Sequence, residues 1–459
     1  MIYRWVCFVQ VFFMFNRQQS YIEKQRTALF LRKEHPSHFF FFAVFFLSLF
    51  VSSQVLCRNS AGLEIAIGDF LSSAKNDFLL KNQEEKISFL HTTSPNTPFL
   101  NKVEFRTRTD EGFEHSGQRY SLRLYPNGQG ETKAGEKVYH ATVKSNRTQY
   151  DLLLHRALKK RYILVINLLK ELDYLDLKKK LMLVHEDKAI VLNSRINTPD
   201  FRITEFIKAK DTLVELQIEI IGLENKISAV EESIRLCMQT ENSIALKGET
   251  LAGVDLVRKT FLQFDHHVDD DNIYLKNSNY DKEIVQGMLE LEKAEGKRYL
   301  NFFEAAYDND EGGRPSDSIS FGVGINLPFI RSNRMDVNRR KLQFLSAKGE
   351  HEELKRSLGE NVRLLSGEMN NMFRQYDVLM EEKTTGGTES ALKKYMETEG
   401  VDPLMLLDMQ ESIVKTDILI KQKQYEIYTK YLEYLDISGQ LTRRPIRNYL
   451  SPDLGQIEL

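Results

Sequence analysis

The sequence is poor in residues that interrupt or cross-link a chain. Its 459 residues include 10 prolines, 1 tryptophan and 3 cysteines, Cys7, Cys57 and Cys237. The cysteines form no C-x-x-C pair and no zinc-ligand spacing with histidine, so we expect neither a disulfide framework nor a zinc site. The net charge of −2 excludes a global basic surface, and we expect no nucleic-acid partner.

No pattern in the chain is typical of catalysis. We find no nucleophile–base pair and no phosphate-binding loop, so we expect no catalytic residue, no cofactor and no enzyme activity. His266 and His267, which precede Asp269-Asp270-Asp271, are the one metal-like cluster. Because no predicted helix or hairpin frames them, we interpret this segment as a solvated polar loop and predict no metal site.

The N-terminus contains one apolar run, His38–Ser53, which follows a basic stretch. A run of about fourteen apolar residues is short for a membrane span and is typical of a signal peptide. We therefore interpret residues 1–53 as a signal peptide with an overlong amino-terminal region, whose real start would lie further along, for example at Met14. The alternatives are a retained N-terminal anchor or, less favoured because Leu56 precedes it, a lipid attached to Cys57.

Residues 318–327 alternate between two kinds of side chain. One parity holds serine, glycine and asparagine, and the other is apolar: Ile319, Phe321, Val323, Ile325 and Leu327. Successive side chains of a strand point to opposite sides, so the segment predicts a strand with one apolar face and one small, polar face. Pro328, which lacks an N–H for a sheet ladder, ends it, and a charged helix follows from about Arg334.

Three more segments, 100–109, 119–125 and 298–307, alternate in the same way. Glycine-containing loops at 110–118 and 308–317 join the four segments into two hairpins. If the register holds, a polar face would contain Glu104, Arg106, Arg108, Ser320 and Asn326.

The rest of the chain predicts long helices. Residues 136–193 contain almost no glycine or proline, which predicts a helix on the order of 90 Å long. We expect further helices at 63–90, 201–238, 280–293, 334–383, 389–397 and 404–441, with Gly386-Gly387 as a break. The helices 201–238 and 404–441 carry side chains at alternating spacings of three and four, which is the seam of a coiled coil. In the first of them the seam is Leu213, Leu216, Ile220, Leu223, Ile227, Val230 and Ile234.

The order helix, hairpin, long helix, turn, long helix occurs twice. This internal repeat divides the chain into residues 54–240 and 241–441, followed by a C-terminal tail at 442–459. Each chain supplies four strands, which cannot close a barrel alone, and lipid tolerates only closed sheets. Three chains would supply about twelve strands, enough to enclose a lumen. The predicted fold is therefore α+β, mainly long α-helical coiled coil, with four transmembrane strands per protomer in a shared trimeric barrel above an α-helical tunnel.

Three segments resemble the TolC-like outer-membrane efflux proteins. Phe321–Phe329 resembles their strand-to-helix junction, Gly400–Gln410 resembles their helical turn with its L-L-D-x-Q segment, and Tyr431–Leu441 resembles their closing helix. The resemblance implies a homotrimer in the lipid of a bacterial outer membrane, with its helices in the periplasm. It also implies passive export of small molecules or proteins, together with a periplasmic adaptor and an inner-membrane transporter.

The resemblance also implies candidate functional residues. Asp408 and Asp402 would lie at the closed periplasmic end, where a ring of carboxylates favours cations. Two alternatives stay open, because Asp402 suits an N-cap and Asp408 suits a helix dipole. The expected adaptor-docking turns contain Pro199, Asp200, Arg202, Gly400, Val401 and Pro403. The expected strand-to-helix junction contains Gly322, Gly324 and Pro328.

A periplasmic coiled-coil adaptor, such as a membrane fusion protein, or a structural protein is the alternative function. Membrane fusion proteins place one helical hairpin beside compact β domains. This chain instead predicts two hairpins of each kind, which favours the channel.

Overall fold

A computed structural model describes residues 63–93, 99–109, 118–198, 201–240, 244–246, 251–309, 318–327, 333–385, 387–397 and 401–458. They all belong to one unit of the chain, Gly62–Leu459. The expected signal peptide and Cys57 lie outside the described residues, as do Pro199, Asp200, Pro328, Gly386 and Gly400.

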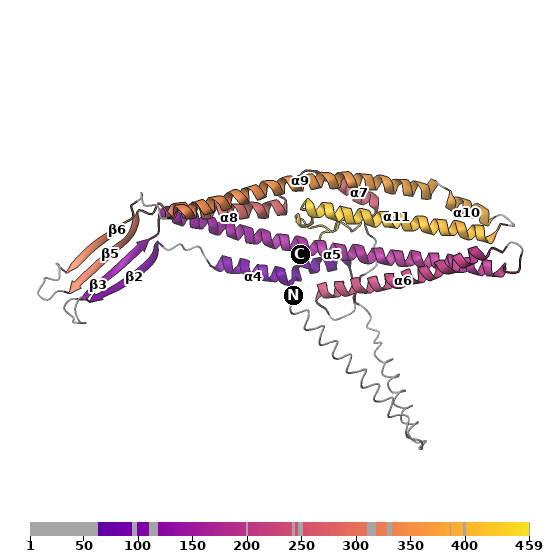
Figure 1. Cartoon of the computed structure of the whole chain (residues 1–459), viewed down its shortest axis with the longest axis horizontal. Coiled ribbons are helices and arrows are strands. Elements are labelled where there is room, and N and C mark those ends of the chain that lie inside the picture. The colour runs from indigo at the N-terminus through magenta and orange to yellow at the C-terminus, as the bar shows by residue number, and fades with distance from the viewer. Residues whose placement is uncertain are drawn as a thin grey trace, which may run out of the picture. The chain divides into compact units, whose positions relative to one another are not determined.

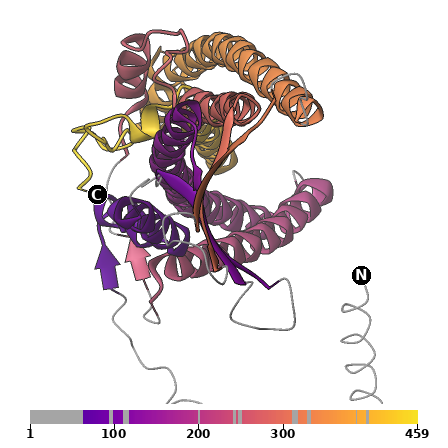
Figure 2. The same ribbon diagram turned by 90° about the vertical axis from the view of Figure 1, so that its left-hand side faces the viewer.

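Two very long helices run through this unit, α5 (Gln129–Ser194) and α9 (Arg334–Thr385). At 66 residues, α5 is roughly 100 Å long. On the half nearer the sheet, α4 (Phe78–Thr92) packs on α5, and α8 (Ile273–Glu295) packs on both long helices. On the other half the neighbours follow the order α6 (Ile203–Met238), α5, α11 (Pro403–Ile437), α9. Each half is therefore four helices wide, and the end view shows the helices in a curved layer (Figure 1, Figure 2).

The predicted element order is present in both halves. A helix, a hairpin, a long helix and a returning helix occur as α4 to α6 and again as α8 to α11. The seam of α6 is buried at Leu216, Ile220, Leu223, Ile227 and Ile234, as the heptad spacing predicted. The predicted break is also confirmed, because α9 ends at Thr385 and Gly387 has a φ of 75° before α10 (Thr388–Met396).

The prediction of one helix over residues 63–90 is wrong. Leu63–Ile65 form a strand, β1, which pairs in parallel with β4 (Ile244–Leu246). A short helix, α3 (Ile67–Ser72), and a 3₁₀ turn, η1 (Ser73–Asn76), then precede α4. The buried Arg161 of α5 donates hydrogen bonds to Ser73 O, at 3.3 Å, and to Asp77 Oδ1, at 2.6 Å, which holds this bend. A contact so distant in sequence leaves no trace in the local periodicity.

The second half begins in a matching way. There β4 precedes a short helix, α7 (Val254–Leu262), in a part of the sequence where no helix was predicted. The next helix, α8, starts at Ile273, earlier than the predicted residue 280, because Asn272 caps it by accepting a hydrogen bond from Tyr274 N at 3.0 Å.

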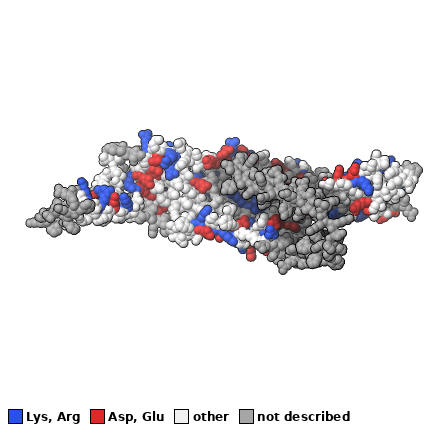
Figure 3. Space-filling model, turned by 60° about the horizontal axis from the view of Figure 1, so that its bottom comes forward, with Lys and Arg blue, Asp and Glu red and all other residues white. Residues whose placement is uncertain are grey.

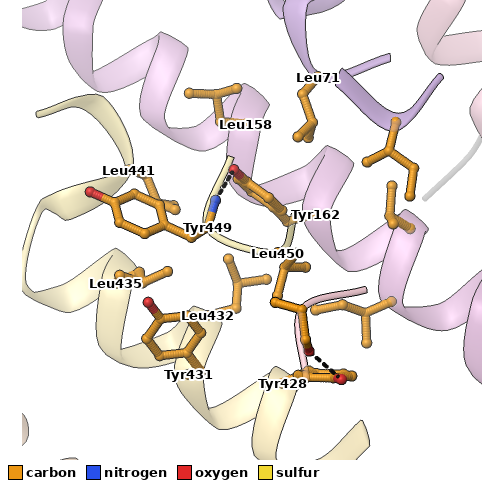
Figure 4. Packing of buried hydrophobic residues seen from close by; sticks show 14 of the residues in the cluster. Leu71, Leu158, Tyr162, Tyr428, Tyr431, Leu432, Leu435, Leu441, Tyr449 and Leu450 are labelled. Carbon is orange, nitrogen blue, oxygen red and sulfur yellow. Dashed lines mark hydrogen bonds between the residues drawn. The ribbon is translucent and has the colours of Figure 1, made fainter. Parts of the chain in front are cut away.

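The C-terminal segment packs into the middle of the helical layer. Tyr449 and Leu450 lie between Leu158 and Tyr162 of α5 and the apolar face of α11 (Figure 4). The Tyr162 hydroxyl oxygen accepts a hydrogen bond from Tyr449 N at 3.3 Å (Figure 4). The segment predicted only as a tail therefore contributes to the main hydrophobic core, with Leu441 of the short 3₁₀ helix η2 (Gln440–Thr442) beside it.

A buried polar cluster sits beside this core. Asp436 of α11 accepts hydrogen bonds from Lys159 at 2.6 Å and from Tyr274 Oη at 2.7 Å, and it lies 2.9 Å from His155 Nε2. Burial opposes its ionisation, but these three partners outweigh burial and bring the pKa of Asp436 to about 2. The carboxylate thus fixes the mutual positions of α5, α8 and α11.

The four predicted strands form one antiparallel sheet at the end of the helices. The strands β2 (Leu100–Thr109), β3 (Gln118–Pro126), β5 (Leu300–Asn309) and β6 (Ile319–Ile325) follow the order β2-β3-β5-β6. Directly opposed residues build apolar rows across the sheet, for example Phe105, Leu122, Ala305 and Phe321. The neighbouring row is polar: Glu104, Arg123, Glu304 and Gly322. The register therefore matches the predicted two-faced alternation.

The two glycines of β6 differ in what surrounds them. A Cβ at Gly324 would lie 2.3 Å from Phe302 Cε1, and that ring packs against Tyr125 and the Arg123 guanidinium. A Cβ at Gly322 would meet Glu304 Cβ at 3.5 Å, an ordinary contact.

We expect Gly324→Ala to destabilise the sheet by about 1–3 kcal/mol, because the Phe302 ring has to move out of its packed position. Gly322→Ala is the matched control and should change stability little. Unfolding of the purified variants in denaturant measures the difference. Equal stability of the two variants would contradict the packing of the Phe302 ring over Gly324.

Candidate pore surface and helical tip

The polar face of the sheet carries paired charges. Arg123 Nη2 lies 3.0 Å from Glu304 Oε2, and Arg106 Nε lies 3.1 Å from Glu104 Oε1. Tyr125 also donates a hydrogen bond to Glu104 Oε2 at 2.7 Å. Arg108 belongs to the same face, because it lies opposite Arg119, which points to the same side of β3 as Arg123. Ser320 belongs to it as well, because Ser320 lies opposite Ala306, in the cross-strand row that also contains Arg106. Asn326 lies just beyond β6 and donates to Arg298 O at 3.2 Å.

The opposite face of the sheet is apolar and open to its surroundings. Phe321 is 83% exposed and Phe105 is 66% exposed. In the part of the chain that the structure describes, β2 and β6 each pair with a strand on one side only. Their outer N–H and C=O groups are therefore available to further strands.

The other end of the helices is the tip, where α5 leads into α6 and the chain enters α11. Asp402 caps α11 by accepting a hydrogen bond from Leu404 N at 3.1 Å. Arg195, directly after α5, also donates to this carboxylate, and its hydrogen bond lowers the pKa of Asp402. The N-cap alternative for Asp402 is thus confirmed, and the same carboxylate joins the ends of α5 and α11.

The second candidate, Asp408, belongs to an ion-pair cluster between α5 and α11. Lys188 Nζ lies 2.6 Å from Asp408 Oδ1 and also contacts Glu411. Lys415 pairs with Glu411, and His185 Nε2 lies 3.6 Å from Glu411 Oε2. The cluster borders a groove of about 650 Å³ between α5, α6 and α11. The Asp408 side chain is 71% exposed, so it keeps contact with solvent despite its pairing.

Sequence reasoning missed Lys188, His185 and Glu411. Lys188 and His185 lie on α5, more than two hundred residues before Asp408, and α5 carries lysines along most of its length. Only the packing of α5 against α11 singles them out. The heptad seam of α11 predicted that it packs on another helix but gave no indication of which one.

The expected docking turns are described only in part. Arg202 precedes α6 and pairs with Glu205 Oε1 at 3.0 Å, while its side chain is largely exposed. Pro403 is the first residue of α11, and Val401 precedes its cap. Apolar side chains are exposed close by: Ile196, Ile203, Met396 and Met405.

Within the described ranges no group of three or more His, Cys, Asp and Glu residues could hold a metal ion. His266 lies 3.0 Å from the Tyr434 hydroxyl, whereas the exposed His267 pairs with Asp265.

No helix among the described residues is long and apolar enough to cross a membrane. Acidic and basic side chains are interspersed on the face in view in Figure 3.

The ion-pair cluster predicts a pH dependence of stability. Burial opposes the ionisation of Glu411, but hydrogen bonds from Lys188 and Lys415 outweigh it and bring the pKa of Glu411 to about 2, from an ordinary value of 4.5. A carboxylate with a depressed folded-state pKa stabilises the fold above the unfolded pKa, and this contribution is lost as the pH falls from about 4.5 towards 2.

We expect the melting temperature of the unmodified protein to fall more steeply between pH 6 and pH 3 than that of Glu411→Gln, by a few degrees. The other carboxylates, including Asp436, are common to both proteins, so the difference isolates Glu411. If the melting temperatures of both proteins fall by the same amount over this pH range, the Glu411 ion pairs contribute nothing to stability.

Solved structures of outer-membrane channels share this fold. The VceC outer-membrane protein of Vibrio cholerae is 11% identical with a TM-score of 0.57, over 81% of this chain and 96% of that chain. The Campylobacter jejuni CmeC channel is 10% identical with a TM-score of 0.56, over 81% and 84%. The open Neisseria gonorrhoeae MtrE channel is 13% identical with a TM-score of 0.59, over 82% and 90%. No family model and no curated protein matches the sequence. As its sequence resemblance predicted, this chain has the fold of the TolC-like outer-membrane channels.

Proposed function

We propose that the protein is the outer-membrane channel of a bacterial tripartite efflux or type I secretion system, a passive trimeric duct for small molecules or proteins. The observation that carries the proposal is the two-faced sheet with open edges at the end of the long helices. An apolar face suits lipid, and a face of paired charges suits a water-filled lumen. The helices would extend into the periplasm.

The open edges favour closure by further copies of the chain. Within lipid an unpaired strand edge is unfavourable by several kcal/mol for each group, so β2 and β6 need partners. A ring in which β6 of one protomer pairs with β2 of the next satisfies both edges. Three protomers would give about twelve strands, enough for a lumen.

The helical layer supports the same ring. In the order α6, α5, α11, α9 the two outer helices carry exposed apolar stripes. The stripe of α6 is Ile203, Ile207, Val214, Ile218 and Ile221, and on the same half of the layer α9 exposes Leu364 and Val378. On α6 it lies opposite the buried seam. Such stripes would be covered if α6 of one protomer packs on α9 of the next, a head-to-tail contact that closes into a ring.

We expect Ile218→Glu to weaken the trimer, because it places a charge in the centre of the α6 stripe. Ile218 is 65% exposed in the single chain, so the change has little reason to disturb the protomer itself. Gln217→Glu adds the same charge to the side of α6 between its exposed stripe and its buried seam, and it is the matched control. The trimer fraction on native gels, at concentrations spanning about a hundredfold, measures the effect. An undiminished trimer for Ile218→Glu would contradict this interface.

At the tip we propose that Asp408 and Asp402 surround the closed periplasmic end, and that the turns containing Pro199, Asp200, Arg202, Gly400, Val401 and Pro403 dock the adaptor. The exposure of Asp408 and of the apolar side chains near both turns supports these roles. Because Arg195 and the α11 cap engage Asp402, Asp408 would be the carboxylate more available to a passing cation.

Asp408→Asn should weaken block of the single-channel current by divalent cations in planar bilayers, because it removes up to three carboxylates from the trimeric tip. Asp453→Asn, which changes an exposed carboxylate of the C-terminal segment, is the control. Unchanged cation block in Asp408→Asn would remove this residue from the constriction.

The alternative function is a periplasmic adaptor or structural protein, and cell fractionation distinguishes it from the channel. A channel should sediment with the outer membrane and migrate as a heat-modifiable trimer. An adaptor should be released from the envelope or follow the inner membrane. Capture of a periplasmic adaptor by cross-linking at the turns would then test the tripartite assembly.

A further inference from the structure

A groove of about 850 Å³ opens where the sheet meets the helices. Its sheet side is apolar and includes Phe303, which shares a face with the exposed Val103 and Val323. Phe99, Tyr299 and Leu300 continue this apolar lining. Its helix side is formed by the first turns of α5 and the last turns of α8. Small residues shape the floor, because a Cβ at Gly130 would lie 3.3 Å from Ala294 Cβ.

The helix side of the groove is strongly basic. Four lysines line it: Lys133 and Lys137 in the first turns of α5, Lys293 in the last turn of α8, and Lys297 just after that helix ends. Lys137 is paired with Glu290, at 2.7 Å, and Arg298 with Glu131. The other three lysines are exposed and have no ion pair with any residue that the structure describes. Like charges gathered in one groove repel one another, so an anion bound there would relieve this repulsion and give the three lysines a common partner.

We propose that this groove binds one anionic phospholipid, with its phosphate among Lys133, Lys293 and Lys297 and an acyl chain along Phe303 and Tyr299. The inference rests on the proposed outer-membrane location, which places the groove at the periplasmic surface of the bilayer. There the inner leaflet supplies phospholipid rather than lipopolysaccharide. The groove fits this ligand because basic and apolar halves adjoin, as headgroup and chain do. A free phosphate would use the lysines but leave the aromatic half unoccupied.

The bound lipid would also act on the fold. Lys133 comes from α5 of the first repeat, Lys293 and Lys297 come from the end of α8 and the turn after it in the second, and the apolar lining comes from residues beside β2 and from β5. A phosphate between the two helices joins both repeats at the point where the barrel strands leave the helices. Anionic lipid should therefore raise the thermal stability of the protein.

The test uses the full-length protein, purified in detergent and examined by native mass spectrometry with dioleoyl phosphatidylglycerol or dioleoyl phosphatidylethanolamine. We expect retained phosphatidylglycerol adducts and few phosphatidylethanolamine adducts. Glycerol phosphate at the same concentration should neither bind nor compete. Lys293→Glu with Lys297→Glu should weaken phosphatidylglycerol retention by more than about twenty-fivefold, because each basic residue near an anionic headgroup contributes roughly fivefold and the new carboxylates also repel the phosphate.

Two further variants serve as controls for this test. Lys293→Gln with Lys297→Gln removes charge without reversing it and should weaken retention by about twenty-fivefold, less than the reversal does. Lys160→Glu with Lys348→Glu makes the same charge change at exposed lysines further along α5 and α9, and should bind lipid as the unmodified protein does. Equal retention of both lipids, equal retention by all variants, or competition by glycerol phosphate would each overturn the lipid site.

Fractionation of the same variants separates this inference from the proposed function. A protein that sediments with the outer membrane as a trimer but shows no lipid preference refutes only the lipid site. A protein that is absent from the outer membrane refutes the proposed function, and the lipid site with it.

Discussion

The hydrogen-bonding requirement of the sheet is the constraint on which the rest of this structure depends. Four strands satisfy one another inside the order β2-β3-β5-β6 but leave the outer edges of β2 and β6 open. One face of the same sheet exposes Phe105 and Phe321. In water the N–H and C=O groups of the open edges are hydrated, but exposure of the apolar face is unfavourable. In lipid the apolar face is well solvated, but the unpaired groups of the edges are unfavourable. A closed ring of several copies in a membrane satisfies both conditions at once.

The helices are held together differently along their length. In the middle, Asp436 bridges α5, α8 and α11 beside a tyrosine-rich core that also contains the C-terminal segment. At the tip, α5 and α11 are joined by the Lys188 cluster and by Arg195 with Asp402, ion pairs in which several of the carboxylates are half-exposed. Exposed ion pairs contribute little to stability compared with buried packing. The pairs that involve Asp408 and Asp402 are therefore expected to contribute less to stability than the buried Asp436 bridge in the middle.

Local patterns predicted the regular part of the fold well. Strict alternation identified β2, β3, β5 and β6, because one face of each strand is polar and the other apolar. Heptad spacing identified the buried seam of α6, and the Gly386-Gly387 pair identified the break after α9. The failures have a common cause. Arg161, which holds the bend at residues 73–77, lies at least 84 residues further along the chain. The strand β1 likewise forms only by pairing with the distant β4. Lys188 acquires its partners only through helix packing, so no local pattern marks it.

The charges of the polar sheet face bear on how a channel with this wall would select its cargo. Among the described residues each carboxylate of that face has a basic partner: Glu104 with Arg106, Glu304 with Arg123 and Asp308 with Arg119. Paired charges in contact with water exert little field beyond their immediate surroundings. The described part of this face also carries Lys102 and Arg108, however, so its five basic residues outnumber its three carboxylates and a wall of this kind would favour anions. We propose that selection for cations arises at the tip instead, since Asp408 and Glu411 share Lys188 there and Asp408 keeps most of its surface in solvent.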